Sequence, residues 1–254
     1  MPEDATDRFA ELVAAGDDLP LDQAMLAIAA HARPDLDVEA ELDRLDALAG
    51  AAPTGDPVAL VRHLCDDLGF AGDRDTYHDA RNSLLPDVLD RRLGIPISLS
   101  VVAMEVGRRT GGPLVGIGMP GHFLVRPAEA DGPYLDVFDG GRELDAAACR
   151  AVFEGLHPTT AWEDAFLAPV GATAIVVRTL ANLANAYRRV GDRRGLAWVL
   201  ALRLLLPGAT ARDRRELAVV LGALGRFGEG AEVLEAVPEE CDQVAAARLR
   251  ARLN

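Results

Sequence analysis

The chain has 254 residues, of which 50% are hydrophobic, and it carries a net charge of −14. This composition indicates a globular protein with a sizeable core and excludes an intrinsically disordered chain. The acidity disfavours nucleic-acid binding, because phosphate contacts need a basic footprint. No apolar run approaches the ~18 residues that span a bilayer, and the acidic N-terminus lacks the basic segment of a signal peptide. We therefore expect a cytoplasmic protein without a membrane segment.

The acidic residues are concentrated in the first part of the chain. Residues 1–90 contain 21 acidic residues and 6 arginines, a charge of −15, whereas residues 91–254 carry +1. We interpret the acidic part as solvated helix surface, and a docking surface for a basic partner is the alternative. The three cysteines, Cys65, Cys149 and Cys241, form neither a disulfide framework nor a metal-binding pattern, so no metal or other cofactor is expected.

Residues 1–78 are predicted to form an acidic helical region. Apolar residues recur at helical spacing in four segments, at 9–13, 21–31, 38–48 and 57–68. Asp56 is a suitable cap for the fourth segment, because Pro57 then stands at the first helical position. A short fifth helix is expected from residue 84 to 92, capped by Asn82 or Ser83.

Residues 79–170 are predicted to form an α+β core in which a buried helix packs on an antiparallel sheet. The helix is expected at 96–110, since Pro96 stands at its start, Gly111 follows its end and nearly all its residues are apolar. Strands are expected at 114–117, 122–126 and 134–138.

His122 and Asp136 are predicted to meet across the second and third strands. If residue 126 faces residue 134, the side chains of His122 and Asp136 lie on one face of the sheet as diagonal neighbours. A histidine oriented by a carboxylate is the base half of a nucleophilic triad, although both residues can also be purely structural. Gly121 ends a G-x-G-x-x-G pattern. We interpret it as a tight turn that presents His122, because a dinucleotide site would need a helix here.

Ser98 is the nearest candidate nucleophile. It stands in the first turn of the central helix, where backbone N–H groups are unpaired and the helix dipole is positive. This environment favours a thiolate strongly and an alcohol much less, and no cysteine lies between Gly94 and Asp136. We therefore favour the interpretation that Ser98 and Ser100 satisfy local hydrogen bonds.

The chain after Arg142 is predicted to be helical, with a repeat in residues 171–254. Two sets of residues recur at an offset of 34: Leu183, Tyr187, Gly191, Ala197 and Leu200, then Leu217, Leu221, Gly225, Ala231 and Leu234. A helix–turn–helix period of 34 residues is the tetratricopeptide signature, and a generic helical bundle is the alternative. Two repeats need support from the preceding domain or from a capping helix, which we expect at 243–253.

Four segments of the sequence together resemble one family. They are Asp79-Ala-Arg81-Asn82-Ser83-Leu84-Leu85, Gly94-Ile95-Pro96-Ile97-Ser98-Leu99-Ser100, Pro120-Gly121-His122-Phe123-Leu124 and Leu135-Asp136. These segments resemble the SirB-type branch of bacterial transglutaminase-like proteins. That branch joins a papain-like, transglutaminase-like core to tetratricopeptide-like helices.

The resemblance implies two of three catalytic positions. In active members of the superfamily a cysteine starts the central helix, and that position falls at or beside Pro96 here. His122 and Asp136 match the other two positions. Arg81, Asn82, Pro96 and Gly121 are further candidates for lining the cleft.

We predict from these observations a non-catalytic binding or regulatory protein, a pseudoenzyme that holds a peptide or protein partner. The degenerate cleft and the helical tail would form its binding surface. The alternative is a serine-dependent amidase or acyltransferase that uses Ser98, His122 and Asp136. The sequence leaves the oligomeric state open.

Overall fold

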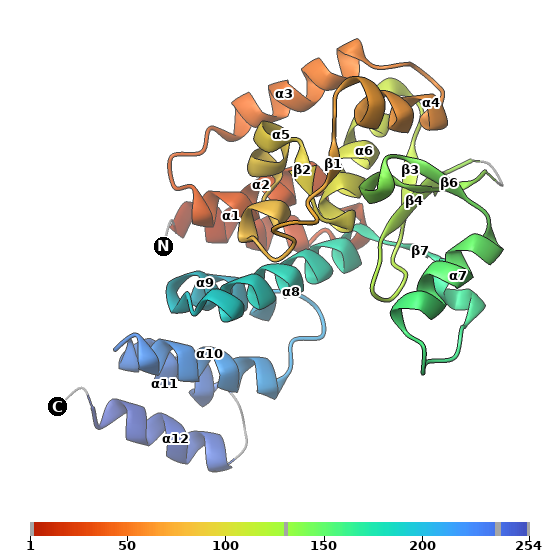
Figure 1. Cartoon of the computed structure of the whole chain (residues 1–254). Coiled ribbons are helices and arrows are strands. Elements are labelled where there is room, and N and C mark those ends of the chain that lie inside the picture. Colours follow the sequence, from red (N-terminus) through yellow and green to blue (C-terminus); the bar gives the residue numbers. More distant parts are fainter. Residues whose placement is uncertain (1–2, 130–131, 237–239, 253–254) are drawn as a thin grey trace.

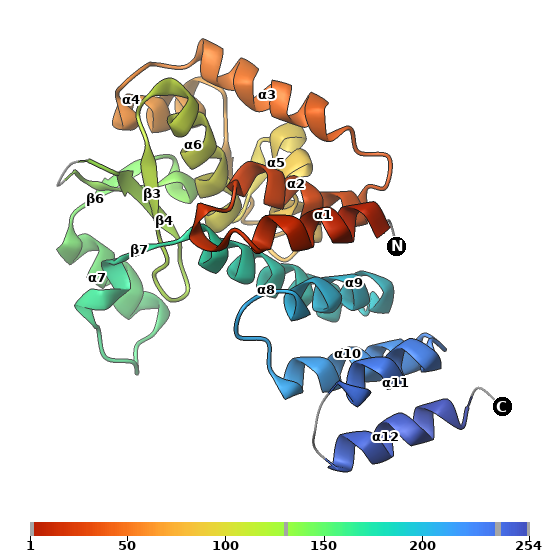
Figure 2. The same ribbon diagram turned by 180° about the vertical axis from the view of Figure 1, so that it is seen from behind.

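The computed structural model of this protein describes residues 3–129, 132–236 and 240–252. A body that contains a small antiparallel sheet carries a stack of helices at one end (Figures 1 and 2). The protein is therefore α+β and mostly helical, as the sequence predicts.

The N-terminal region is helical, as predicted. Its helices are α1 (Glu3–Val13), α2 (Leu21–Ala32), α3 (Val38–Ala51) and α4 (Pro57–Arg62). Asp56 caps α4 by accepting hydrogen bonds from the N–H groups of Val58 and Ala59 at 3.0 Å. A π-turn at His63–Asp67 continues α4 towards the end of the predicted segment. The parallel pair β1 (Ala71–Gly72) and β2 (Leu93–Gly94) is too short for a sequence pattern to reveal.

The central helix α6 runs from Pro96 to Thr110, the bounds that the sequence predicts. Gly111 ends it in the left-handed conformation, with φ +76°, which glycine adopts without strain. The apolar residues of α6 pack against α3 and the strands β3 and β4, so α6 lies in the core. The preceding helix α5 (Leu85–Arg91) has Leu84 at its N-cap, so neither Asn82 nor Ser83 caps it.

Within the described residues, the main sheet has five strands in the order β6-β5-β4-β3-β7, and every neighbouring pair is antiparallel. The strands are β3 (Leu114–Ile117), β4 (Leu124–Pro127), β5 (Tyr134–Asp136), β6 (Arg142–Leu144) and β7 (Pro169–Val170). Val125 pairs with Leu135, which is the register that the sequence predicts.

Three details of the sheet correct the prediction. β4 begins at Leu124, so His122 lies in the turn before the strand. β5 ends at Asp136, because the Asp136 carboxylate accepts a hydrogen bond from the Asp139 N–H at 3.1 Å and starts a 3-10 turn. The chain after Arg142 is not wholly helical, since β6 and β7 flank the helix α7 (Ala146–Leu156).

The tail is a stack of helices beyond β7. These are α8 (Ala172–Val190), α9 (Arg193–Leu204), α10 (Ala211–Ala223), α11 (Phe227–Glu235) and α12 (Glu240–Arg250). In both views α8 and α9 lie next to the body, α10 and α11 follow, and α12 lies farthest away (Figures 1 and 2). Gly191 and Gly225 occupy left-handed turns between the helices of each pair, with φ +70° and +78°, as the offset of 34 residues predicts.

One apolar core runs through the body and the first helices of the tail. It includes Phe9 of α1, Leu99 of α6, Val125 of β4 and Leu183 of α8, all fully buried. A second cluster around Phe153 packs α7 against the sheet. A third cluster holds the end of the tail and contains Ala218, Ala231, Leu234 and Ala246. The first core therefore extends across residues 78–79 and 170–171, where the sequence predicts boundaries between three regions.

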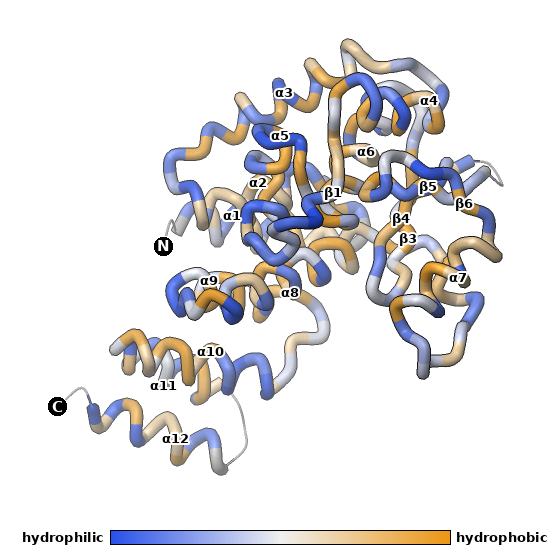
Figure 3. The backbone as a smooth tube through the Cα atoms, viewed as in Figure 1, coloured by the Kyte–Doolittle hydropathy of each residue, from blue (hydrophilic) through white to orange (hydrophobic). Residues whose placement is uncertain are grey.

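The loop between β1 and α5 differs from this core in polarity. Figure 3 shows its residues 73–79 in blue, as hydrophilic, whereas β3 and β4 are mostly orange, as hydrophobic. The loop packs against α8 through the 3-10 turn Ala80–Ser83. Among the described residues, no helix is long and apolar enough to cross a membrane.

Candidate functional site

His122 and Asp136 meet, which confirms the predicted pairing. His122 Nε2 lies 2.7 Å from Asp136 Oδ2, and both residues are buried. The other carboxylate oxygen accepts from the Asp139 N–H. A carboxylate that holds one ring nitrogen orients the imidazole and leaves Nδ1 for any further proton transfer. The contact thus has the geometry of a histidine oriented by a carboxylate.

Arg178 of α8 fixes the turn that carries His122. Its guanidinium donates to Met119 O at 3.0 Å and to His122 O at 2.6 Å, and it lies 5.4 Å from the Phe123 ring centre. Burial lowers the pKa of Arg178, because the charged form loses hydration. The sequence gives no sign of this role of Arg178. No local pattern distinguishes an arginine of a tail helix that contacts a distant turn.

Gly121 shapes the same turn. Its φ is +76°, and a Cβ added there would lie 2.5 Å from His157 Nε2, after α7. Any other residue would therefore be strained there and would require the His157 ring to shift. The predicted role of Gly121 in a tight turn before His122 is confirmed, and its contacts are with the end of α7.

Ser98 bonds to the backbone. Its hydroxyl donates to Asn82 O at 2.5 Å, with Ile95 O at 3.1 Å as a second acceptor, and it accepts from the Ile95 N–H at 3.1 Å. The side chain is 1% exposed. It ties the start of α6 to the 3-10 turn of the preceding loop, which confirms the local role favoured from the sequence. Ser100 differs, because its buried Oγ has no hydrogen-bond partner among the described residues.

The two thiols near Asp136 are poor nucleophiles. Cys65 Sγ lies 3.8 Å from Val137 O, and burial raises the pKa of this thiol to about 11. Burial also raises the pKa of Cys149 to about 11. Both thiols are therefore protonated at neutral pH, and the thiolate is the form that attacks.

Asn82 has a structural role, in contrast to its predicted place in the cleft. It is fully buried, its amide donates to Thr76 O at 2.8 Å, and its carbonyl accepts from Arg91 at 2.8 Å. Arg91 also forms a salt bridge with Asp73 at 2.8 Å. Burial alone would raise the pKa of Asp73, but hydrogen bonds from Thr76 and Arg91 hold it well below its ordinary value. This network fixes the loop at 73–83.

Arg81 and Pro96 also have local roles. Arg81 is exposed and forms a salt bridge with Asp79 at 2.6 Å. Pro96 is buried at the first position of α6, directly after its N-cap Ile95. The place where a family cysteine would start the helix therefore holds side chains without a reactive group.

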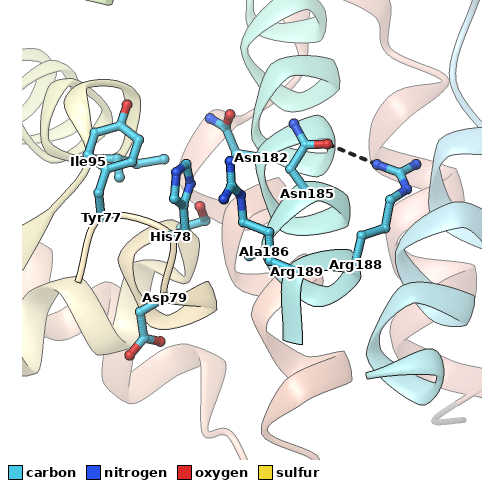
Figure 4. A pocket seen from close by; sticks show the side chains of 10 residues that line it. Tyr77, His78, Asp79, Ile95, Asn182, Asn185, Ala186, Arg188 and Arg189 are labelled. Atoms are coloured by element: carbon cyan, nitrogen blue, oxygen red, sulfur yellow. Dashed lines mark hydrogen bonds between the residues drawn. The ribbon is translucent and has the colours of Figure 1, made fainter. Parts of the chain in front are cut away.

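A cavity of about 410 Å³ lies between the loop at 73–83 and α8 (Figure 4). The loop contributes Tyr77 and His78, and α8 contributes Asn182, Asn185 and Arg189. Ile95 also lines it, so the cavity lies beside the start of α6. Arg81, Asn82, Pro96 and Gly121 are not among its lining residues.

Aromatic contacts connect this cavity to His122. The ring centre of Tyr77 lies 5.9 Å from that of Phe138, and the Phe138 ring lies 6.2 Å from the His122 ring, both edge to face. Burial raises the pKa of the Tyr77 hydroxyl, so it is protonated at neutral pH. Tyr77 belongs to no sequence motif, so the sequence does not indicate its place in the cavity.

Comparisons with known proteins agree with this architecture. The family model described as the transglutaminase-like superfamily matches residues 21–181. A UPF0162 protein of Xylella fastidiosa is 44% identical over 152 residues, which are 58% of this chain and 54% of the relative. A UPF0162 protein of Pseudomonas aeruginosa is 38% identical over 134 residues, 52% of this chain and 48% of the relative.

A mammalian protein also contains a similar region. Mouse F-box only protein 21 is 35% identical over 137 residues, which are 50% of this chain and 21% of that protein. The chain spans about half the length of the bacterial relatives described above. No solved structure matches it significantly.

Proposed function

Because this chain belongs to the transglutaminase-like superfamily, we propose that it is a non-catalytic member that binds a peptide or protein partner. The binding surface is the cleft beside the start of α6 together with the helical tail, which we interpret as tetratricopeptide-like. A core of this superfamily joined to such a tail fits the SirB-type branch.

The observation that carries the proposal is the position of the Ser98 hydroxyl. A serine triad needs this oxygen within about 2.6–3.2 Å of a ring nitrogen of the base. Here the Ser98 hydroxyl is bonded to the backbone of Asn82 and Ile95 instead. Pro96 offers no nucleophile at the helix start. The His122–Asp136 pair then acts as a link between the turn and β5.

The geometry of the tail supports its role in binding. Ala197 and Ala231 are buried at equivalent positions of α9 and α11, and glycine turns join the helices of each pair. Small residues at these positions allow close helix packing. Stacked helix pairs form extended surfaces that hold peptide segments.

A serine-dependent amidase or acyltransferase is the alternative, and the intact His122–Asp136 pair favours it. This function requires the first turn of α6 to rearrange. Ser98 would have to release its backbone partners and turn towards His122 Nδ1.

Hydrolysis assays separate the two functions. We expect the purified protein to cleave p-nitrophenyl acetate and glutamine-containing peptides no faster than its His122→Ala variant does. The Ser98→Ala variant should match both. Hydrolysis that disappears in both variants, while circular dichroism shows them folded, would establish the enzyme and exclude the binding protein.

A matched binding experiment tests the proposal directly. A displayed peptide library is selected against the wild-type protein, and the dissociation constants of the enriched peptides are then measured. Tyr77→Ala should lower the affinity for these peptides, because Tyr77 lines the cavity. His122→Ala should leave the affinity unchanged. A library without enrichment would contradict the proposal.

A further inference from the structure

We propose that the cavity between the loop at 73–83 and α8 binds an acidic side chain of an extended peptide, with Arg189 as the counter-ion. The inference rests on the proposed binding function and adds the chemical class of the partner. It commits to an internal glutamate or aspartate of a protein segment.

Arg189 is a cation of the cavity wall that lacks an acidic partner among the described residues. Figure 4 shows its guanidinium beside the His78 ring and near the Asn182 amide. The other charged groups of the wall are paired. Arg188 forms a salt bridge with Glu216 at 2.7 Å, and Asp79 is neutralised by Arg81. The cavity therefore has one uncompensated positive charge, which a carboxylate would complement.

The polar groups of α8 follow the length of an extended peptide. Asn182, Asn185 and Arg189 are spaced by three and four residues, so they lie on one face of the helix. Seven residues of helix rise about 10 Å, and an extended peptide advances about 3.3 Å per residue, so about three residues of peptide cover this face. Carboxamides both donate and accept, which suits peptide N–H and C=O groups. The Asn185 oxygen already accepts from Arg188 at 2.9 Å, so Asn185 offers its amino group to a peptide C=O.

The cavity continues into a second one, which favours an internal acidic residue over a carboxyl terminus. The second cavity has a volume of about 600 Å³ and shares Tyr77, His78, Asp79 and Arg189 with the first. Asp75 and Asp192 also line it, so the acidic side chain of the peptide fits beside Arg189 in the first cavity and uncharged residues pass through the second. It extends along α8 to Val190, whose side chain is 74% exposed. A peptide can therefore pass through both cavities, and Val190 offers an apolar contact to the residues that follow.

The charge of the N-terminal region and the order of the cavity wall favour binding of the peptide at this site. Residues 1–90 carry a charge of −15, which repels an acidic peptide from that part of the surface and disfavours binding there. The opposite wall is held by the network of Asp73, Asn82 and Arg91. A wall that is already ordered lowers the entropic cost of binding.

The test uses three acetylated hexapeptides, two of them amidated, and the full chain. The acidic probe is Ala-Leu-Glu-Glu-Leu-Ala, and its neutral match carries glutamine in place of glutamate. A third peptide carries glutamine and a free carboxyl terminus. Binding is followed by the NMR shifts of the Asn182 and Asn185 side-chain amides. We expect the acidic probe to bind at least about tenfold more tightly than the other two, with weaker binding at high salt.

Charge-reversal variants locate the contact. Arg189→Glu should lower the affinity for the acidic probe about tenfold or more. Arg194→Glu makes the same change at an exposed position of α9 outside the cavity and should leave this affinity unchanged. Equal binding of all three peptides would overturn the acidic preference and leave the binding function standing. The inference would also be overturned if the peptide with the free carboxyl terminus bound more tightly than the acidic probe, or if the two variants had equal effects on binding. It would likewise be overturned if neither asparagine side chain showed an NMR shift. Hydrolysis that depends on Ser98 would instead overturn the proposed function.

Discussion

Ser98→Ala and Ser100→Ala form a matched pair that tests the structural role of Ser98. The two serines lie two residues apart in α6, and both are buried. Both variants gain a similar benefit of about 0.5 kcal/mol from the higher helix propensity of alanine. The difference between them therefore reports the hydrogen bonds of the hydroxyl groups.

The structure predicts opposite outcomes. Ser98→Ala removes the acceptor of the Ile95 N–H and the donor to Asn82 O, which should lower the free energy of unfolding by about 1–3 kcal/mol. The remaining contact from Ile95 N to Asn82 O is 3.5 Å long and too weak to compensate. Ser100→Ala removes a buried hydroxyl that has no hydrogen-bond partner in the described part of the chain, so the free energy of unfolding should stay constant or rise by up to about 1 kcal/mol.

Urea unfolding followed by circular dichroism measures both values. For a chain of this size, 1 kcal/mol corresponds to about 2–4 °C in melting temperature, so Ser98→Ala should melt several degrees below Ser100→Ala. The urea dependence of the free energy should be the same in both variants, which shows that the unfolded states are comparable. Equal stabilities of the two variants would refute the claim that Ser98 is bound to the backbone, and would return it to the list of candidate nucleophiles.

Two further predictions concern the tail and its contact with the body. Burial lowers the pKa of His31, whose ring stacks on Trp198 of α9 at 5.4 Å, so the unfolded chain binds its proton at higher pH than the folded protein does. The free energy of unfolding should therefore fall as the pH drops below about 6.5, and should level off once the pH is below the pKa of His31 in the folded protein. When unfolding is measured from pH 8 to 5, this pH dependence should be smaller in the His31→Phe variant. Gly195→Ala would place a Cβ 2.5 Å from the Tyr187 ring and should cost about 1–3 kcal/mol, while Gly155→Ala in α7, which meets nothing within 4 Å, should be neutral or stabilising. Equal melting temperatures of the two glycine variants would refute the close contact between α8 and α9.

The sequence predicts those parts of the fold that depend on local signals. Pro96 and Gly111 mark both ends of α6, because one fits only the first turn and the other adopts the left-handed conformation. Residues 126 and 134, placed opposite each other across the loop, predict the register that pairs Val125 with Leu135, and with it the contact between His122 and Asp136. Boundary residues and the pairing of strand positions are therefore sufficient to predict these features from the sequence.

The remaining features depend on contacts between distant segments. The sequence predicts that Asn82 lines the cleft, but Arg91 and Thr76 hold it in the core, and no spacing in the sequence reveals that network. Arg178 contacts the His122 turn from a helix whose pattern indicates only a repeat. The cavity between the loop at 73–83 and α8 forms only when segments about a hundred residues apart pack together, so its lining residues share no motif.

The separate apolar cluster at the end of the tail has a consequence for the dynamics of the protein. The first core joins α1, α6, β4 and α8, so these elements cannot open one at a time without exposing apolar surface of the others. The third cluster consists mostly of alanines and lies outside that core. Local opening of α11 and α12 should therefore need less free energy than opening of the body, and their amide protons should exchange with solvent first. Arg178 of α8 holds the His122 turn to the body, so this turn should stay ordered while the far end of the tail opens and closes.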